Sequence, residues 1–416
     1  MIKKILVKGP ALSRSGYGEQ TRFALRALRT REDIFDIYLI NIPWGHTGHI
    51  FADDEEREWL DNLMRKTVQF VQVERKQFDV SLQVTIPNEW EKIAPINIGY
   101  TAGIEATKVA PVWLLKGNEM DKIIIISNHS KEVYETSTCT AQNQDTGEVV
   151  ENYRCETPIE VISYPVQKFE PAPIDGFKLE HDFNFLVVAQ WGIRKNLDNT
   201  IKWFVEEFKD DEVGLVVKTN IAKDCLIDRE VTTNRLRALL LPYKDRKCKV
   251  HLLHGTLSEG EMTWLYNHDK IKALISLSHG EGFGLPLFEA AYNGLPLITT
   301  LWSGQADFIY APNKSGKQRP MVAKVGHTLG LIPPEAHWEG VLEKDAMWAY
   351  PIKEQYTRQL REVYKNHPRF KSAATKLQKH IQKNFKLEDF YADFVGAIYT
   401  EEELEWLKEL GSIEIL

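Results

Sequence analysis

The stretch that decides the fold spans residues 276–298 and reads SLSHGEGFGLPLFEAAYNGLPLI. The aliphatic run 273–277 that leads into it predicts a strand ending at Ser278, and the glycines that follow predict a loop. Pro286 suits the first turn of a helix, so strand, loop and helix are expected in that order. The amides of Gly282, Phe283 and Gly284 would then point toward a ligand, with the positive end of the helix behind them.

Two glutamates lie in this stretch. Glu281 is on the loop, and Glu289 follows eight residues later on the predicted helix. A carboxylate at either position can accept hydrogen bonds from two neighbouring hydroxyl groups, such as those of a ribose or another sugar. Spacing alone fits an ordinary strand–turn–helix with two solvated glutamates equally well, because glycine loops are common.

The same alternation of short aliphatic runs and helix-length amphipathic segments extends along most of the chain. It is typical of parallel sheets covered by helices, which predicts an α/β fold. The stretch 164–182 contains three prolines and little periodicity, as a connector would. We therefore expect two Rossmann-like, doubly wound domains, over residues 1–170 and 171–386, with ligands at the carboxyl ends of the strands.

Two segments interrupt this pattern. Residues 136–157 are polar and predict an inserted β-hairpin, which would make Cys139 and Cys155 neighbours, although two separate free thiols fit as well. Residues 313–345 are rich in glycine, proline and lysine, and we expect an irregular loop there.

A cationic pair follows the first predicted strand of the second domain, in VVAQWGIRKNL over residues 187–197. Arg194 can hold two oxygens of a phosphate, and Lys195 supplies a compact charge. Fixed cations beside a departing diphosphate would stabilise the charge that grows as its bond breaks. Lys218 ends the next strand, where contact with the same ligand and simple solvation fit equally.

In the first domain a glycine-containing loop follows the opening strand. Gly16 and Gly18 allow a ligand to approach the backbone at the start of the next helix. Arg22 and Arg26 lie one turn apart on that helix, so they share a face that is either solvated or able to attract an anionic acceptor. Glu105 follows another strand and is a candidate for acceptor contact.

Composition narrows the function classes. The chain has 416 residues, 43% of them hydrophobic, and a net charge of −7, which argues against binding nucleic acid through bulk positive charge. Four cysteines without a CxxC pair fit a reduced, cytoplasmic setting, and neither a secretory signal nor a membrane-length apolar run is present. The sequence contains no HExxH, DxD, Walker or GxSxG motif, so those chemistries are not expected.

The stretch E-G-F-G-L-P-x-x-E-A followed by N-G-L-P-L-I closely resembles the EX7E element of retaining GT-B glycosyltransferases, especially family 4. The resemblance implies two domains facing each other across a cleft, with C-terminal helices over residues 387–416 crossing back to the first domain. It also implies that Glu281 contacts the donor sugar, that Glu289 holds the ribose, and that Arg194 and Lys195 meet the phosphates. Many members carry an arginine where this chain has Gln190, and Arg194 would substitute for it.

The resemblance further implies transfer of a sugar from a nucleotide diphosphate, UDP- or GDP-linked, with retention of configuration and with no metal or other cofactor. The acceptor remains open between a glycan, a lipid-linked saccharide and a small metabolite, the lipid case placing the protein at the membrane periphery. Modified DNA bases, as in phage glucosyltransferases, are the alternative within enzymes. A non-catalytic sugar-nucleotide-binding or assembly protein is the alternative outside them. The tail 401–416 either packs on the first domain or forms a homodimer contact.

Overall fold

A computed structural model of the chain describes residues 2–45, 47–51, 53–142, 146–165, 168–313 and 315–411. The chain divides into two compact units. Unit 1 consists of Met1–Tyr164, His337–Ala346 and Lys386–Leu416, and unit 2 consists of Pro165–Ala336 and Met347–Phe385. The change of unit after Tyr164 comes six residues before the expected end of the first domain. Parts of the expected hairpin (143–145) and tail (412–416) lie outside the described residues.

Unit 1 contains a six-stranded parallel sheet in the order β2-β1-β3-β4-β5-β8. Its central strands are buried on both faces, as parallel strands between helices are. The strands are β1 (Lys3–Gly9), β2 (Phe35–Asn41), β3 (Val80–Val84), β4 (Ile96–Thr101), β5 (Lys122–Ile125) and β8 (Ile159–Val161). The helices are α1 (Gly16–Arg29), α2 (Glu55–Val68), α3 (Pro111–Gly117), α4 (Asn128–Thr136), α11 (Leu387–Ile398) and α12 (Glu401–Gly411).

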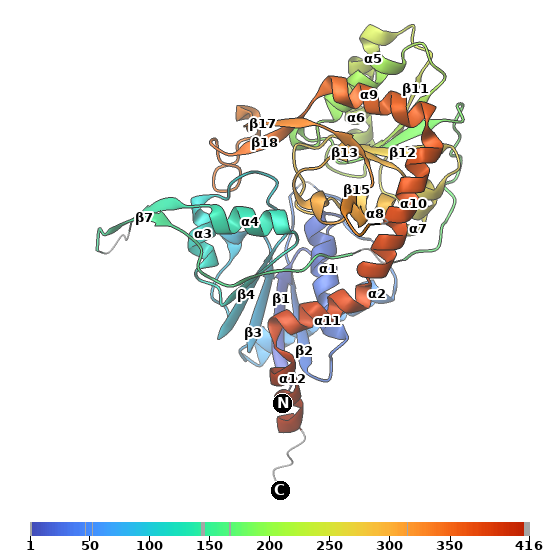
Figure 1. Ribbon diagram of the computed structural model, residues 1–416. Coiled ribbons are helices and arrows are strands. Elements are labelled where there is room, and N and C mark those ends of the chain that lie inside the picture. The colour runs from blue at the N-terminus through green and yellow to red at the C-terminus, as the bar shows by residue number, and fades with distance from the viewer. Residues whose placement is uncertain are drawn as a thin grey trace. The chain divides into compact units, whose positions relative to one another are not determined.

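The end of the chain completes the core of unit 1. On α11, the Phe394 ring lies 5.6 Å from Phe23 of α1 and 5.2 Å from Tyr100 of β4, measured between ring centroids. Figure 1 shows α11 in red alongside the blue α1. Helices that begin 371 positions apart, at Gly16 and Leu387, thus share one apolar cluster, and burial of such rings is a large favourable contribution to stability.

Unit 2 contains a second six-stranded parallel sheet, in the order β11-β10-β9-β12-β13-β16. Phe204 and Phe208 of α5 pack on Phe185 of β9 in its core. The strands are β9 (Asn184–Val188), β10 (Gly214–Thr219), β11 (Lys249–His254), β12 (Ile271–Ser276), β13 (Leu297–Thr300) and β16 (Ala323–Val325). The helices are α5 (Leu197–Phe208), α6 (Leu226–Leu240), α7 (Glu259–Asn267), α8 (Leu285–Tyr292), α9 (Lys353–Lys365) and α10 (His367–Asn384).

In the part of the chain that the structure describes, three antiparallel two-stranded sheets accompany the two parallel ones: β6–β7, β14–β15 and β17–β18. The first pairs Cys139–Gln142 with Val149–Tyr153, and both Cys139 and Cys155 are free thiols. The second pairs Tyr310–Pro312 with Gln318–Pro320, and the third pairs His327–Leu331 with Met347–Pro351. The expectation of an irregular loop over 313–345 is therefore wrong in part, because short strands, including β16 of the main sheet, form within it.

Candidate functional site

The order of the strands in unit 2 determines where the candidate site lies, which is at the carboxyl ends of β9 and β12. From β9 the chain adds strands toward one edge of the sheet, and from β12 it adds them toward the other edge. The order of the strands therefore reverses between β9 and β12, which are parallel, hydrogen-bonded neighbours. At such a reversal the loops after the two strands diverge and leave room for a ligand. Arg194 and Lys195 follow β9, and Glu281 follows β12, so this topology brings together residues 86 and 87 positions apart.

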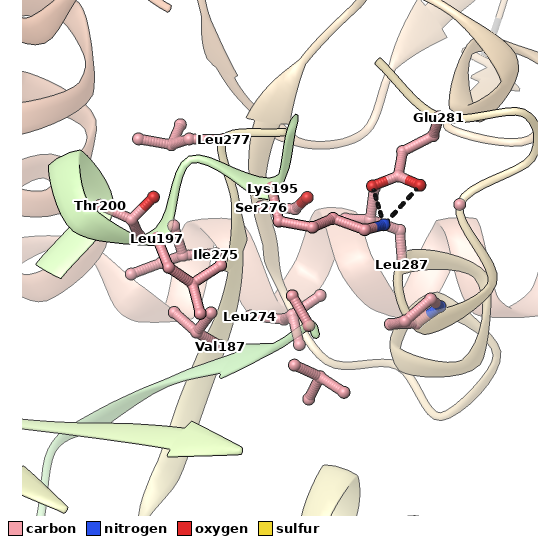
Figure 2. A pocket seen from close by; sticks show the side chains of 14 residues that line it. Val187, Lys195, Leu197, Thr200, Leu274, Ile275, Ser276, Leu277, Glu281 and Leu287 are labelled. Carbon is pink, nitrogen blue, oxygen red and sulfur yellow. Dashed lines mark hydrogen bonds and ion pairs between the residues drawn. The ribbon is translucent and has the colours of Figure 1, made fainter. Parts of the chain in front are cut away.

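The three predicted charged residues form one ion-pair cluster. Lys195 donates from Nζ to Oε1 and Oε2 of Glu281 at 2.6 and 2.8 Å. Arg194 donates from Nη1 to Oε2 of Glu281 at 3.3 Å and to the carbonyl oxygen of Gly280 at 2.6 Å. Figure 2 shows the Lys195 ammonium between the two oxygens of Glu281, in a pocket lined mostly by apolar side chains and by the hydroxyls of Thr200 and Ser276.

The electrostatics of this cluster follow from its burial. Only 8% of Glu281 is exposed. Burial by itself would raise the pKa of its carboxyl group, but Lys195 and Arg194 outweigh burial and hold the pKa at about 2. Glu281 is therefore ionised at neutral pH, and the two cations are fixed in place before any ligand arrives.

Asn196 explains the local geometry of the cationic pair. It adopts a left-handed conformation with φ 55°, which asparagine tolerates better than most residues, and it directly precedes α5. Its Nδ2 donates to the carbonyl oxygen of Leu277, at the end of β12. The turn that carries Arg194 and Lys195 is thus tied to the strand that leads to Glu281.

A third loop, after β13, supports Glu281 from behind. The amide of Glu281 donates to Oγ of Ser303 at 2.9 Å, and the amide of Gly304 donates to the carbonyl oxygen of Glu281 at 2.8 Å. A Cβ atom on Gly304 would lie 1.9 Å from the carbonyl oxygen of Gly282, so only glycine fits there. The sequence analysis missed Ser303 and Gly304, although both follow a strand at the predicted edge of the sheet.

Glu289 lies on α8 and has a partner that the sequence analysis also missed. The hydroxyl of Tyr266, on α7, donates to Oε2 of Glu289 at 2.6 Å. Burial and the nearby carboxylate raise the pKa of Tyr266 well above its usual value, so the phenol remains a donor. On the loop before α8, Phe283 is buried against Phe288 and Phe308, and Gly284 directly precedes the helix.

Lys218 is one strand further along the sheet, at the carboxyl end of β10, and it is half-buried. The loop that follows is held by Asp228, which accepts hydrogen bonds from the amides of Ile221, Ala222 and Lys223. Asp228 also accepts from His254 at 2.8 Å, at the end of β11. Burial would raise the pKa of Asp228, but these donors hold it well below its usual range.

In unit 1 the two candidate arginines are held by groups of their own unit. Arg22 is buried, and its Nη1 donates to the carbonyl oxygens of Ala11 and Ser13 in the loop after β1. Arg26 pairs with Glu19 and, through both Nε and Nη2, with Glu56. Carboxylates and carbonyls of unit 1 thus accept hydrogen bonds from both guanidinium groups.

The two candidate glycines also differ from each other. Gly18 is buried, and its amide donates to the Oγ of Ser15, the N-cap of α1, so it closes the loop. Gly16 is exposed at the first position of the same helix. Glu105 lies nearby, with its Oε2 and the hydroxyl of Tyr17 both within 4 Å of a Cβ atom placed on Gly103.

Unit 1 has its own open hollow, of about 510 Å³, at the point where its strand order reverses. Lys8 of β1 lines it, and Lys8 forms an ion pair of 2.7 Å with Glu91, which follows β3. The other lining residues are Ile42, Pro43, Asn88, Glu89, Trp90 and Lys116. Charged and aromatic side chains therefore lie side by side at the carboxyl edge of this sheet.

Two kinds of feature are absent from the residues that the structure describes. Across them, no three or more His, Cys, Asp or Glu side chains gather as the ligands of a metal ion would. In the same part of the chain, every helix is too short or too polar to cross a bilayer.

Comparison with solved structures identifies the fold. HepE from Anabaena, solved with UDP-glucose, aligns over 95% of this chain and 99% of its own, with a TM-score of 0.57 and 13% identity. A sucrose-phosphate synthase from Thermosynechococcus elongatus aligns over 97% and 100%, with a TM-score of 0.60 and 13% identity. A glycosyltransferase from Rickettsia africae aligns over 99% and 100%, with a TM-score of 0.55 and 14% identity.

Sequence comparison adds the family of one region. No curated protein matches the chain. Residues 266–393 match the family described as family 4 glycosyltransferases in conflict systems, and this range contains Glu281, Glu289 and the loop between them. The chain therefore has the GT-B fold of two Rossmann-like units and carries a region of the family 4 glycosyltransferase type.

Proposed function

We propose that the chain is a retaining glycosyltransferase that moves a sugar from a nucleotide diphosphate, UDP- or GDP-linked, to an acceptor hydroxyl group without a metal ion. The observation that carries this proposal is the cluster of Lys195, Arg194 and Glu281 at the strand reversal of unit 2. The UDP-glucose bound to the structurally similar HepE supports a nucleotide sugar as the donor.

The cations account for activation of the leaving group. As the bond between the anomeric carbon and the β-phosphate oxygen breaks, its electron pair passes to that oxygen and the negative charge on the diphosphate grows. Lys195 and Arg194 would stabilise this charge, and the stabilisation is larger in the transition state than in the ground state. Because Glu281 already fixes both side chains, little reorganisation is needed when the donor binds.

Retention requires the acceptor to approach on the face that the diphosphate leaves. The acceptor oxygen forms its bond to the anomeric carbon, and its proton passes to the departing phosphate oxygen, so the step needs no separate protein base. Glu281 would orient the sugar hydroxyls, and Glu289, held by Tyr266, would accept hydrogen bonds from the ribose. Gly16 and the residues around it, at the start of α1, would approach the donor phosphates.

We place the acceptor in the hollow of unit 1 that Lys8 and Glu91 line. Its charged and amide side chains, from Lys8, Glu91 and Asn88, suit the hydroxyl groups of a polyhydroxylated compound, whether a glycan, the head of a lipid-linked saccharide or a small metabolite. DNA loses the support that it had from the sequence, since Arg22 and Arg26 are occupied within unit 1.

Hydrolysis of a panel of UDP- and GDP-sugars in the absence of an acceptor tests the proposal and names the sugar. The wild-type protein is expected to release the nucleotide from at least one donor. Lys195→Ala and Glu281→Ala are each expected to lower this rate by ~10²-fold or more. The first variant loses a cation beside the leaving diphosphate, and the second loses the carboxylate that fixes both cations.

Lys353→Ala is the matched control, because Lys353 forms a 2.7 Å ion pair with Glu206 outside the site. It is expected to leave hydrolysis unchanged. Wild-type rates in the Lys195 or Glu281 variant would contradict the site, and binding of a nucleotide sugar without turnover of any donor would favour a non-catalytic binding protein.

A further inference from the structure

His279 stands two residues before Glu281 and has no part in the chemistry proposed above. It is 7% exposed. Its amide donates to the carbonyl oxygen of Arg194 at 2.8 Å, so its main chain joins the loop of the cationic pair to the loop of Glu281. Any displacement of His279 therefore moves the backbone on both sides of the ion-pair cluster.

β18 supplies further hydrogen bonds and ring contacts to His279, from Ala349 and its two neighbours. Its carbonyl oxygen accepts from the amide of Ala349 at 3.0 Å. Its Nδ1 lies 2.8 Å from the carbonyl oxygen of Ala349, and because a carbonyl can only accept, Nδ1 carries the hydrogen. The ring stacks on Trp348 with an angle of 9° between the planes and also packs on Tyr350.

β18 lies outside the main sheet, so it gives His279 an anchor that is separate from the strands that carry the site. It pairs with β17 in a hairpin of its own, and Trp348 and Ala349 are fully buried. Ala349 thus makes two hydrogen bonds with His279, and Trp348 and Tyr350 each make a ring contact with it. A side chain with this many partners in fixed geometry loses most of its rotamer freedom, as the support of a precise site requires.

We propose that His279 is a positioning residue, which aligns Arg194 and Glu281 for reaction by fastening their two loops to β18. The effect of His279 on catalysis rests on the function proposed above. Its effect on the rigidity of the loop 278–284 does not. The part of the ring that the alignment needs is the Nδ1–H group.

Three variants separate this role from others. Asparagine carries its Nδ2 as many bonds from Cβ as histidine carries Nδ1, so His279→Asn keeps the hydrogen bond to Ala349, whereas His279→Ala loses it. His367→Ala is the matched control, because His367 in unit 2 is also partly buried and directs one ring nitrogen to a carbonyl oxygen, that of Lys272. Thermal unfolding of each variant measures the fraction that is folded.

The first measurement is donor hydrolysis without acceptor. His279→Ala is expected to lower kcat about tenfold or more with KM for the donor changed less than about twofold, because a misplacement of ~1 Å slows a reaction while the nucleotide contacts remain. His279→Asn is expected to recover to within about threefold of the wild type. Unchanged kcat in His279→Ala would overturn the proposal, and so would an Asn variant as slow as the Ala variant.

The second measurement is hydrogen exchange of the amides in residues 278–284, in the wild type and in His279→Ala. Faster exchange there, with unchanged exchange in the same segment of His367→Ala, supports the proposal, and equal exchange in all three proteins overturns it. If the wild type hydrolyses no donor, the proposed function fails, and exchange alone decides the role of His279.

Discussion

Lys195 and Glu281 stabilise each other at a site whose proposed ligand is a dianion. A buried carboxylate is costly unless it is paired, and removing one member of such a pair leaves the other uncompensated. The same contacts that prepare the site for a diphosphate thus contribute to the stability of unit 2, and the pH dependence of stability can test this contribution separately from activity.

Stability of the wild type is expected to fall relative to Glu281→Gln as the pH is lowered from about 4.5 to about 2. The folded-state pKa of Glu281 is lower than in the unfolded chain, so its ionised form contributes stability above the unfolded value and loses it below. At about 1.4 kcal/mol for each pH unit between the two pKa values, the difference should shrink by roughly 3 kcal/mol. Chemical unfolding of both proteins at several pH values measures it.

Glu206→Gln serves as the comparison, since Glu206 pairs with Lys353 at a more exposed position. Its stability difference from the wild type is expected to change less over the same pH range. An equal change in the two variants would show that the buried Lys195–Glu281 pair contributes no more to stability than the exposed pair does.

Tyr266→Phe is expected to weaken binding of UDP or GDP by about three- to tenfold, because Glu289 loses the donor that fixes its orientation. Calorimetric titration with the nucleotide measures the affinity. Tyr243→Phe is the control: Tyr243 donates to Glu206 at the same distance of 2.6 Å, away from the site. Equal affinities in the two variants would remove Glu289 from the nucleotide site.

For single residues, the sequence predicted the site correctly where charged side chains follow neighbouring strands of a parallel sheet. Arg194, Lys195 and Glu281 were predicted to converge, and they do. The partners of Arg22 and Arg26 could not be predicted, because folding brings the carbonyls of Ala11 and Ser13 and the carboxylate of Glu56 to them. A guanidinium group that binds carbonyls cannot be distinguished by spacing from one that binds phosphate.

At the level of the elements, the start of α1 contains two glycines, Gly16 and Gly18, whose surroundings differ. A Cβ atom on Gly18 would lie 1.9 Å from the carbonyl oxygen of Ser13, whereas one on Gly16 would meet only the hydroxyl of Tyr164 at 3.5 Å. Gly18 is thus required by close packing of the backbone, and Gly16 is free of that constraint.

Gly18→Ala is expected to destabilise the protein by about 3 kcal/mol or more, since the clash is with backbone that cannot move aside cheaply. Gly16→Ala is expected to stay within about 1 kcal/mol of the wild type, at a helix position where alanine is tolerated. Urea unfolding of the two variants makes the comparison. Equal stabilities would show that the loop after β1 is less tightly closed than its contacts indicate.

The elements that the sequence predicted best are the buried parallel strands, such as β9 and β12, because burial on both faces produces a continuous apolar run. Short strands between 310 and 325 were missed because three residues such as Gln318–Pro320 contain no period. Their pairing comes from the surrounding structure, and a sequence window has no access to it.

For the molecule as a whole, the chain passes between the units four times, after Tyr164, Ala336, Ala346 and Phe385. The segment 337–346 joins β17 to β18 of unit 2 but belongs to unit 1. There the Nε1 of Trp113 donates to the carbonyl oxygen of Gly340 at 2.9 Å, and Lys108 pairs with Asp345. No periodicity in the sequence marks this excursion, since its contacts are to single side chains more than 200 positions away.

Trp113→Phe is expected to speed the cleavage of the exposed Lys344–Asp345 bond by trypsin by about five- to thirtyfold. The indole hydrogen bond contributes roughly 1–2 kcal/mol to keeping the segment docked, and cleavage follows local opening. Mass spectrometry of the fragments gives the rate. Trp203→Phe, in unit 2, should leave it unchanged, and similar rates in all three proteins would show that the segment is held by other contacts.

The route of the chain also has a consequence for synthesis. Phe394 reaches its place between Phe23 and Tyr100 only after Pro165–Phe385 have been translated, which takes roughly ten to forty seconds at ~5–20 residues per second. Until then the nascent first unit presents unsheltered aromatic surface outside the ribosome. The core of unit 1 is therefore completed only after unit 2 has been translated.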